Sequence, residues 1–418
     1  MDKRTFLKQL GSTALLTPFL PYDLRAISDD KEGYPSPDTE DFWLRIRRDY
    51  ALKPDYINLE NGYYCITPRP TLKKYFEHIE EINLHGSYYM RTVQWDNKKR
   101  IAQRLAKWLG CGSDELIITR NTTESLDMII SGFPWKAGDE AIYARQDYGS
   151  MIDQFEMIGS RYGVVNKVIS VPNHPESDDE IVALYEQEIT SKTKLIMLCH
   201  MINITGHILP VKKICEMAHR YGVEVMVDGA HCVGHIDVDI GALGCDYYAS
   251  SLHKWLSVPL GAGILYVSRK NIPKIWPLLA EHEREEGGIS RLNHTGTHPV
   301  YTDLAIADAL DYLDMIGLER KEKRLRYLQR YWSEPLREVS GLNVNTPKEL
   351  GRSCGIGNIG VKHIEPLTLA KTLLEEYKIF TVAIDQSNVH GCRITPNIYT
   401  TTAELDRFIE VMTSLSAP

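Results

Sequence analysis

The sequence predicts an α/β fold, in which a large domain with a mostly parallel sheet is followed by a smaller α+β domain. From residue 115 onward, short apolar segments alternate with helix-like segments, which is typical of a buried sheet whose strands are joined by helices. This alternation stops near residue 300, where a long amphipathic segment begins. The 418 residues, of which 43% are hydrophobic, are enough to build a large core.

The elements follow from local patterns. A short strand is expected near residues 56–59, after Pro- and Asp-rich turns, and the segment 70–109 is expected to be helical up to Gly110. Seven strands are predicted for the sheet, at 116–119, 140–143, 164–171, 194–199, 223–227, 247–249 and 262–267. Helices are predicted between most of them, at 122–131, 150–162, 178–190 and 211–221.

The pattern after residue 300 predicts the smaller domain. It begins with one long amphipathic helix over about 303–340. Strands are expected at 342–345, 355–361, 379–383 and 390–394, and helices at 365–376 and 402–415. The predicted divisions are an export signal and linker at 1–30, a segment packing on the small domain at 31–60, a large domain at 61–300 and a small domain at 301–418.

Composition excludes several classes of protein. The net charge of −8 argues against nucleic-acid binding. No apolar run reaches the roughly 18–20 residues of a membrane span. The eight cysteines form no CxxC pair and no ligand-like spacing, so they are expected to be reduced thiols, and no metal site is predicted.

The N-terminus predicts export. Charged residues at 2–4 precede a short, weakly apolar stretch at 10–20, which resembles a twin-arginine (Tat) signal with Lys3 in place of the first arginine. No cleavage site stands out, and an ordinary first helix is the alternative. Because the twin-arginine route carries folded proteins, a periplasmic protein that folds before export is expected; the alternative location is the cytoplasm.

Two residues at strand ends predict the chemistry. Asp228 ends one apolar strand, and Lys254 follows the next one, in the pattern Ser-x-His-Lys. The lysine amine can form a Schiff base with the aldehyde of pyridoxal 5'-phosphate (PLP), and the aspartate can keep the pyridine nitrogen protonated, so that the ring withdraws electrons. Both residues would lie at the carboxyl edge of the sheet, where such folds place their sites. Together they predict a PLP site.

Four segments resemble the class V aminotransferase superfamily of fold-type I PLP enzymes, and most of all its isopenicillin N epimerase-like members. The likeness spans about residues 55–415 and is carried by 121–124 (Asn-Thr-Thr-Glu), 228–231 (Asp-Gly-Ala-His), 251–254 (Ser-Leu-His-Lys) and 392–399 (Cys-Arg-Ile-Thr-Pro-Asn-Ile-Tyr). The resemblance implies a large PLP-binding domain with a mixed, mostly parallel seven-stranded sheet, and a small α+β C-terminal domain. It also implies a homodimer with shared active sites.

The resemblance implies a catalytic set and a phosphate site. Lys254 would carry the Schiff base and move the Cα proton, Asp228 would hold the pyridine nitrogen, and His231 would contact the ring or its phenolic oxygen. Thr122 and Thr123 precede a predicted helix, whose N-terminal N–H groups suit an anion; plain N-capping is the alternative. The remaining phosphate ligands would be Ser251, His253 and, from the neighbouring subunit, Thr297.

Four more residues are implied around the ring and the substrate. Tyr148 would stack on the ring, with core packing as the alternative. Asn203 would lie beside the phenolic oxygen, and a turn residue is its alternative. Arg393 would bind the substrate carboxylate through its planar fork, and a salt bridge on a late strand is its alternative. Asn61 would border the substrate, and a turn residue is its alternative.

The resemblance implies a reaction at the Cα of an amino acid or amino-acid-derived small molecule, through an external aldimine and a quinonoid. An isopenicillin N epimerase-like reaction is predicted. The alternative is an exported aminotransferase, or a C–S lyase that performs β-elimination on a modified amino acid or small peptide. A cysteine desulfurase is disfavoured because residues 378–386 contain no cysteine and Cys392 would face away from Arg393. A non-catalytic PLP-binding protein is disfavoured by the complete lysine, aspartate and arginine set.

Overall fold

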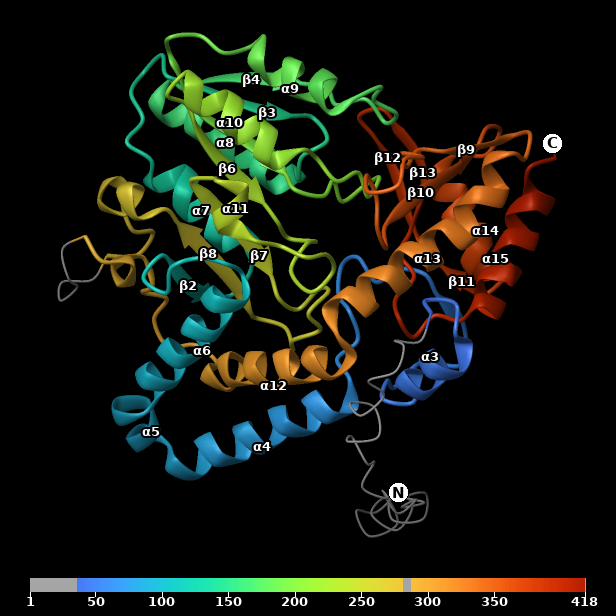
Figure 1. Cartoon of the computed structure of the whole chain (residues 1–418), viewed down its shortest axis with the longest axis horizontal. Helices are drawn as coiled ribbons and strands as arrows, with labels where there is room; N and C mark the ends of the chain where they lie inside the picture. The colour runs from blue at the N-terminus through green and yellow to red at the C-terminus, as the bar shows by residue number, and fades with distance from the viewer. Residues whose placement is uncertain (1–35, 281–286, 418) are drawn as a thin grey trace, which may run out of the picture. The chain divides into compact units, whose positions relative to one another are not determined.

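A seven-stranded mixed sheet forms the centre of the large part of the chain (Figure 1). The computed structural model describes residues 36–280 and 287–417. Across the sheet the strand order is β2-β8-β7-β6-β5-β3-β4; β8 is antiparallel to both neighbours, and the other pairs are parallel. The strands are β2 (Leu116–Thr119), β3 (Glu140–Ala144), β4 (Val165–Ile169), β5 (Thr193–Cys199), β6 (Glu224–Asp228), β7 (Tyr247–Ser251) and β8 (Gly263–Val267). The predicted sheet is confirmed.

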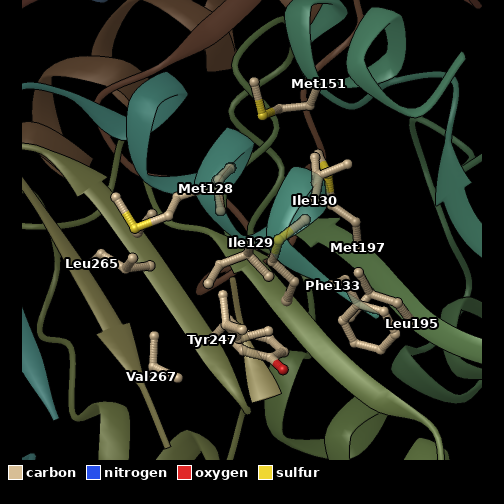
Figure 2. Close-up of a cluster of buried hydrophobic side chains, with 14 of the residues drawn as sticks. Met128, Ile129, Ile130, Phe133, Met151, Leu195, Met197, Tyr247, Leu265 and Val267 are labelled. Carbon is tan, nitrogen blue, oxygen red and sulfur yellow. The ribbon is translucent and has the colours of Figure 1, made fainter. Parts of the chain in front are cut away.

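Helices cover the faces of this sheet (Figure 1). They are α7 (Thr122–Gly132), α8 (Gly149–Tyr162), α9 (Asp178–Glu186), α10 (Val211–Arg220) and the short α11 (Ile240–Leu243). Figure 2 shows Met128 and Ile129 of α7 lying over Leu265 of β8 and Tyr247 of β7, with Phe133, which follows α7, beside Leu195 of β5, and all of them are buried. Burying a side chain of this size stabilises the fold by about 1.5–3 kcal/mol. This core holds the N-terminus of α7 at the edge of the sheet where β6 and β7 end.

The segment before the sheet is helical, as predicted for 70–109, but it is divided. Gly86 separates the first two of these helices. Its φ is 51°, a backbone conformation that glycine adopts at little cost. The helices are α4 (Arg69–His85), α5 (Ser87–Thr92) and α6 (Gln94–Trp108). Ahead of them lie α3 (Glu40–Arg47), which was not predicted, and β1 (Ile57–Asn58).

The C-terminal part builds a second sheet, in the order β12-β13-β10-β9. Its strands are β9 (Leu342–Val344), β10 (Gly357–Val361), β12 (Val382–Gln386) and β13 (Val389–Ile394). Around them lie α13 (Leu318–Arg337), α14 (Pro366–Glu375) and α15 (Thr402–Leu415). The 3-10 helices η1 (Arg269–Lys274) and η2 (Ile289–Leu292) instead add side chains to the core of the seven-stranded sheet, and α12 (Val300–Ile316) packs on α4 and α6. Apolar side chains of α13, α14 and α15 pack with those of the strands into one buried cluster.

Two predictions for this part were wrong. The single helix over 303–340 is two helices, because Gly317 adopts φ 87° between α12 and α13, a conformation that ends a helix. The strand expected at 379–383 is divided between β11 (Ile379–Phe380) and β12, which belong to different sheets.

The N-terminal segment is joined to the C-terminal sheet by backbone pairing. Strand β1 pairs in parallel with β11, and Glu60 forms an isolated bridge with Thr395, just after β13. This pairing brings residues 57–62 beside Arg393. No helix within 36–280 and 287–417 is long and apolar enough to cross a membrane. The predicted domain divisions stay a prediction, and the predicted export signal lies outside the described residues.

Candidate active site

A cavity of about 370 Å³ lies where β5, β6 and β7 end and α7 begins. All predicted site residues except Asn61 and Thr297 line it. The lining side chains and backbone come from Gly62, Tyr63, Arg120, Asn121, Thr122, Thr123, Tyr148, Cys199, Met201, Asn203, Asp228, Ala230, His231, Ser251, His253, Lys254, Leu260, Gly261 and Arg393. Residues that are more than 300 positions apart in the sequence therefore share one site.

Lys254 lies beside His231, with 3.1 Å between Nζ and Nε2. The indole N–H of Trp255 donates to Nδ1 of the same imidazole at 3.2 Å. An indole nitrogen can only donate, so Nδ1 is the accepting nitrogen and the proton of a neutral imidazole is on Nε2. Burial, followed by the charge of Lys254, lowers the pKa of His231 well below its usual value, so the ring is neutral. Its Nε2–H therefore points at the lysine.

In its neutral form, the amine of Lys254 can accept this hydrogen bond. Burial lowers the pKa of its ammonium to about 8, and the charge of Asp228 partly opposes this effect. A buried amine with a depressed pKa is available as a nucleophile and as a base near neutral pH. The structure thus places a reactive amine at the centre of the cavity.

Asp228 ends β6 and faces the same cavity. Its Oδ1 accepts the N–H of Ala230 at 2.9 Å, which fixes the carboxylate plane. Burial raises the pKa of Asp228, while the Ala230 N–H and the charge of Lys254 act in the opposite direction. A buried carboxylate in this position can accept a hydrogen bond from a protonated ring nitrogen.

The start of α7 forms the anion-binding end. Asn121 caps the helix by accepting the Glu124 N–H at 2.8 Å, and the next two residues, Thr122 and Thr123, line the cavity. The hydroxyl of Ser251 lies 2.7 Å from that of Thr122 and accepts the Thr122 N–H at 2.9 Å. Helix N–H groups and hydroxyls that converge in this way suit a phosphate.

The cavity fits PLP on the evidence of its own polar atoms. Nδ1 of His253 and Oδ1 of Asn203 are buried and have no hydrogen-bond partner within the described part of the chain. Buried polar atoms are normally paired, so these two atoms indicate a missing polar ligand. Tyr148, which is 40% exposed, lines the cavity and offers an aromatic face to a flat ring. A phosphate end, an amine, a carboxylate and an aromatic wall are the groups that PLP requires.

Arg393 forms a buried salt bridge. Its guanidinium is bound side-on by Glu60, with Nη2–Oε1 at 2.6 Å and Nε–Oε2 at 3.1 Å. Nη1 donates to the backbone oxygen of Asn203 at 3.2 Å. Glu60 was not among the predicted site residues. No local pattern reveals it, since the pair joins two segments 333 positions apart.

Two predicted residues lie elsewhere. Asn61 is fully buried, and its amide donates to the Thr395 oxygen at 2.7 Å and accepts from the Tyr399 hydroxyl at 2.6 Å. These bonds support the loop, while its neighbours Gly62 and Tyr63 reach the cavity. Thr297 is exposed in the loop before α12, so its predicted role in a neighbouring subunit's site stays a prediction.

The cysteines of this region are not thiolates. Burial raises the pKa of Cys199, the one cysteine among the described residues that line the cavity, well above its usual value. Cys392 is fully buried in the apolar cluster of the C-terminal sheet, with Sγ 3.7 Å from the Pro366 oxygen. A thiolate, not a thiol, is the nucleophile in sulfur transfer.

Sequence comparisons agree with this geometry. The family model "Aminotransferase class-V" matches residues 69–408. Isopenicillin N epimerase of Amycolatopsis lactamdurans is 28% identical over 90% of this chain and 98% of its own, and that of Streptomyces clavuligerus is 26% identical over the same shares. A probable cysteine desulfurase of Halalkalibacterium halodurans is 27% identical over 70% of this chain and 73% of its own.

Solved structures show the same fold. A cysteine desulfurase of Thermococcus onnurineus NA1 superimposes with a TM-score of 0.78 at 22% identity, covering 89% of this chain and 97% of that one. The cystine C–S lyase C-DES gives 0.76 at 21% identity, covering 87% and 97%. Since the family model covers most of the chain, the protein belongs to the class V aminotransferases and is a PLP-dependent enzyme with the fold-type I architecture.

Proposed function

We propose that this enzyme transfers the Cα proton of an amino acid or amino-acid-derived amine, in an isopenicillin N epimerase-like reaction. The observation that carries the proposal is the contact between Lys254 and the buried His231, with 3.1 Å between Nζ and Nε2. When bound, PLP supplies an aldehyde that condenses with a primary amine and a ring that withdraws electrons from the Cα carbon. The protein must then supply a base and hold its proton.

Lys254 is the residue suited to that task. Its amine is neutral in a fraction of molecules at neutral pH, because burial lowers its pKa to about 8. His231 can donate its one Nε2–H to the lysine or to an acceptor on the bound cofactor, and would orient the group that accepts it. Asp228 would keep the pyridine nitrogen of bound PLP protonated, and Tyr148 would supply an aromatic side chain to its ring. A base with a pKa near the working pH is the most effective one.

The cysteines favour proton transfer over sulfur transfer. A persulfide mechanism needs a thiolate within reach of the substrate, and burial keeps Cys199 protonated. Cys392, next to Arg393 in the sequence, is turned into the apolar cluster and away from the cavity. Transamination and β-elimination need no thiolate, so they remain the alternative outcomes of the test.

The test uses the PLP-loaded full chain and a panel of L- and D-amino acids, amino-acid amides and cysteine conjugates in D₂O. Deuterium at Cα together with inverted product supports the proposal. Release of a keto acid means transamination, pyruvate with ammonia means elimination, and persulfide means desulfuration; any of these as the main product contradicts it. The Lys254→Ala variant is the control, which should lose deuterium exchange.

Location and assembly are also part of the proposal. We propose that residues 1–30 direct the folded enzyme to the periplasm and that it functions as a homodimer with shared active sites. Cell fractionation with mass determination of the mature chain tests the first point. Full-length, unprocessed protein found in the cytoplasm alone would contradict it.

A further inference from the structure

We infer that Glu60 determines which substrates this site accepts, because its side-chain carboxylate is bound to Arg393 where a substrate carboxylate would otherwise bind. The site would then take primary amines whose α-carbonyl group is uncharged, such as an amide, an ester or the N-terminal residue of a peptide, in preference to free α-amino acids. The inference rests on the proposed function and adds a substrate class to it.

The pair is held from several sides. Both side chains are buried, with 9% of Arg393 and 6% of Glu60 exposed. Beyond its two bonds to the guanidinium, the carboxylate accepts the Tyr63 N–H at 3.0 Å through Oε1. At Gly62, a Cβ atom would lie 3.0 Å from Cζ of Arg393, so the guanidinium lies directly against the backbone. Glu60 is thus a fixed part of the site.

This arrangement disfavours a substrate carboxylate in two ways. A carboxylate that displaced Glu60 would leave a buried charge without its partner, which is strongly unfavourable. A carboxylate that bound beside Glu60 would place two negative charges on one guanidinium. Either way, the attraction that Arg393 offers to a free amino acid is largely cancelled.

A neutral carbonyl oxygen meets neither obstacle. The guanidinium uses three N–H groups, on Nε and Nη2 for Glu60 and on Nη1 for the Asn203 oxygen. A guanidinium has further N–H groups on its Nη atoms, which remain able to donate to an amide or ester oxygen. Arg393 can therefore orient such a substrate through hydrogen bonds without a net charge.

The other arginine in the cavity wall does not replace Arg393. Arg120 is paired with Glu124, with Nη2–Oε1 at 2.8 Å and Nε–Oε1 at 3.0 Å, near the phosphate end. Each arginine that lines the cavity within the described residues is thus matched by its own glutamate. Neither position therefore carries the net positive charge expected of a carboxylate site.

Two small probes test the inference on the PLP-loaded full chain. Aminooxyacetate and O-methylhydroxylamine react through the same aminooxy nitrogen with the cofactor's carbonyl carbon, form an oxime and release the Lys254 amine; only the first carries a carboxylate. The rate constant for aminooxyacetate is divided by that for O-methylhydroxylamine, both measured by absorbance. This ratio is then divided by the same ratio for free PLP. We expect a normalised ratio within about threefold of one for the wild type, and an increase of about tenfold or more in Glu60→Gln, which restores a net positive charge.

The matched controls separate charge from shape. Glu60→Asp keeps the charge, and Glu60→Gln/Arg393→Gln removes both charges while keeping a polar pair, so both should retain the wild-type ratio. A wild-type ratio well above tenfold, or no increase in Glu60→Gln, would overturn the inference. If Glu60→Gln does not fold, the double variant Glu60→Gln/Arg393→Gln decides. A normalised ratio equal to that of the wild type supports the inference, and a ratio far below it overturns the inference. If the wild-type protein forms neither oxime, this result contradicts the proposed function and not the substrate preference.

Discussion

At the scale of single residues, the chemistry depends on how burial and one hydrogen bond act on Lys254 and His231. Burial lowers the pKa of both groups, that of His231 well below its usual value and that of Lys254 to about 8. The sequence allowed both to be predicted as site residues, since they follow strand ends in recognisable motifs. It could not show that Trp255 donates to His231, because this depends on the orientation of two rings.

The depressed pKa of Lys254 predicts how cofactor loading depends on pH. Imine formation needs the free amine, whose fraction rises with pH towards a plateau above the amine's pKa. With a pKa of about 8 instead of the ordinary 10.5, the rate of PLP incorporation into apo-protein should level off above about pH 8. Stopped-flow absorbance measures this rate. A rate that still climbs steeply near pH 10 would show that Lys254 has an ordinary pKa. The pH dependence of noncovalent PLP binding to Lys254→Ala is measured as a control, because PLP itself also titrates in this range.

The Trp255–His231 contact predicts the tautomer of the imidazole. Trp255→Phe keeps the aromatic ring that stacks on His235 but removes the N–H that occupies Nδ1. In the apo-protein with ¹⁵N-labelled histidine, NMR should report Nε2–H in the wild type and a shift towards Nδ1–H in the variant. The signal is assigned with His231→Gln. Nδ1–H in the wild type would contradict this account.

At the scale of elements, the N-terminus of α7 links helix capping to cofactor binding. Asn121 caps α7 at the cavity, whereas Ser177 caps α9 in the same way, accepting the Glu180 N–H at 3.1 Å. Asn121→Ala and Ser177→Ala should each lower the free energy of unfolding by about 1 kcal/mol. Only Asn121→Ala should also weaken PLP binding, because only α7 presents its N–H groups to the phosphate. Equal PLP affinity in both variants would argue against this phosphate site.

Helices and strands were predicted well where a local pattern of apolar residues defines them. They were predicted poorly where the backbone conformation of one residue, or pairing with a distant segment, determines the structure. The strands at 194–199 and 223–227 are strongly apolar, and the structure has them almost unchanged. The break at Gly317 escaped prediction because apolar residues recur at helical spacing on both sides of it. The place of Glu60 could not be predicted, since it follows from the pairing of β1 with β11 and the bridge to Thr395.

At the scale of the whole molecule, the homodimer proposal predicts a remote effect of Thr297. This residue is exposed and lies outside the cavity wall of its own chain. If it reaches the phosphate of a second copy, Thr297→Ala should weaken PLP binding without changing the stability of the apo-protein. Light scattering and PLP titration check both parts. A monomer, or unchanged PLP affinity, would contradict the proposed sharing of sites.

Lys254 is proposed to hold the cofactor covalently inside this cavity, and chemical trapping of that bond tests the proposal. The full chain is loaded with PLP, reduced with borohydride, digested and analysed by mass spectrometry. We expect a phosphopyridoxyl group on Lys254. A cofactor label confined to other lysines, such as the buried Lys321, with Lys254 unmodified, would contradict it.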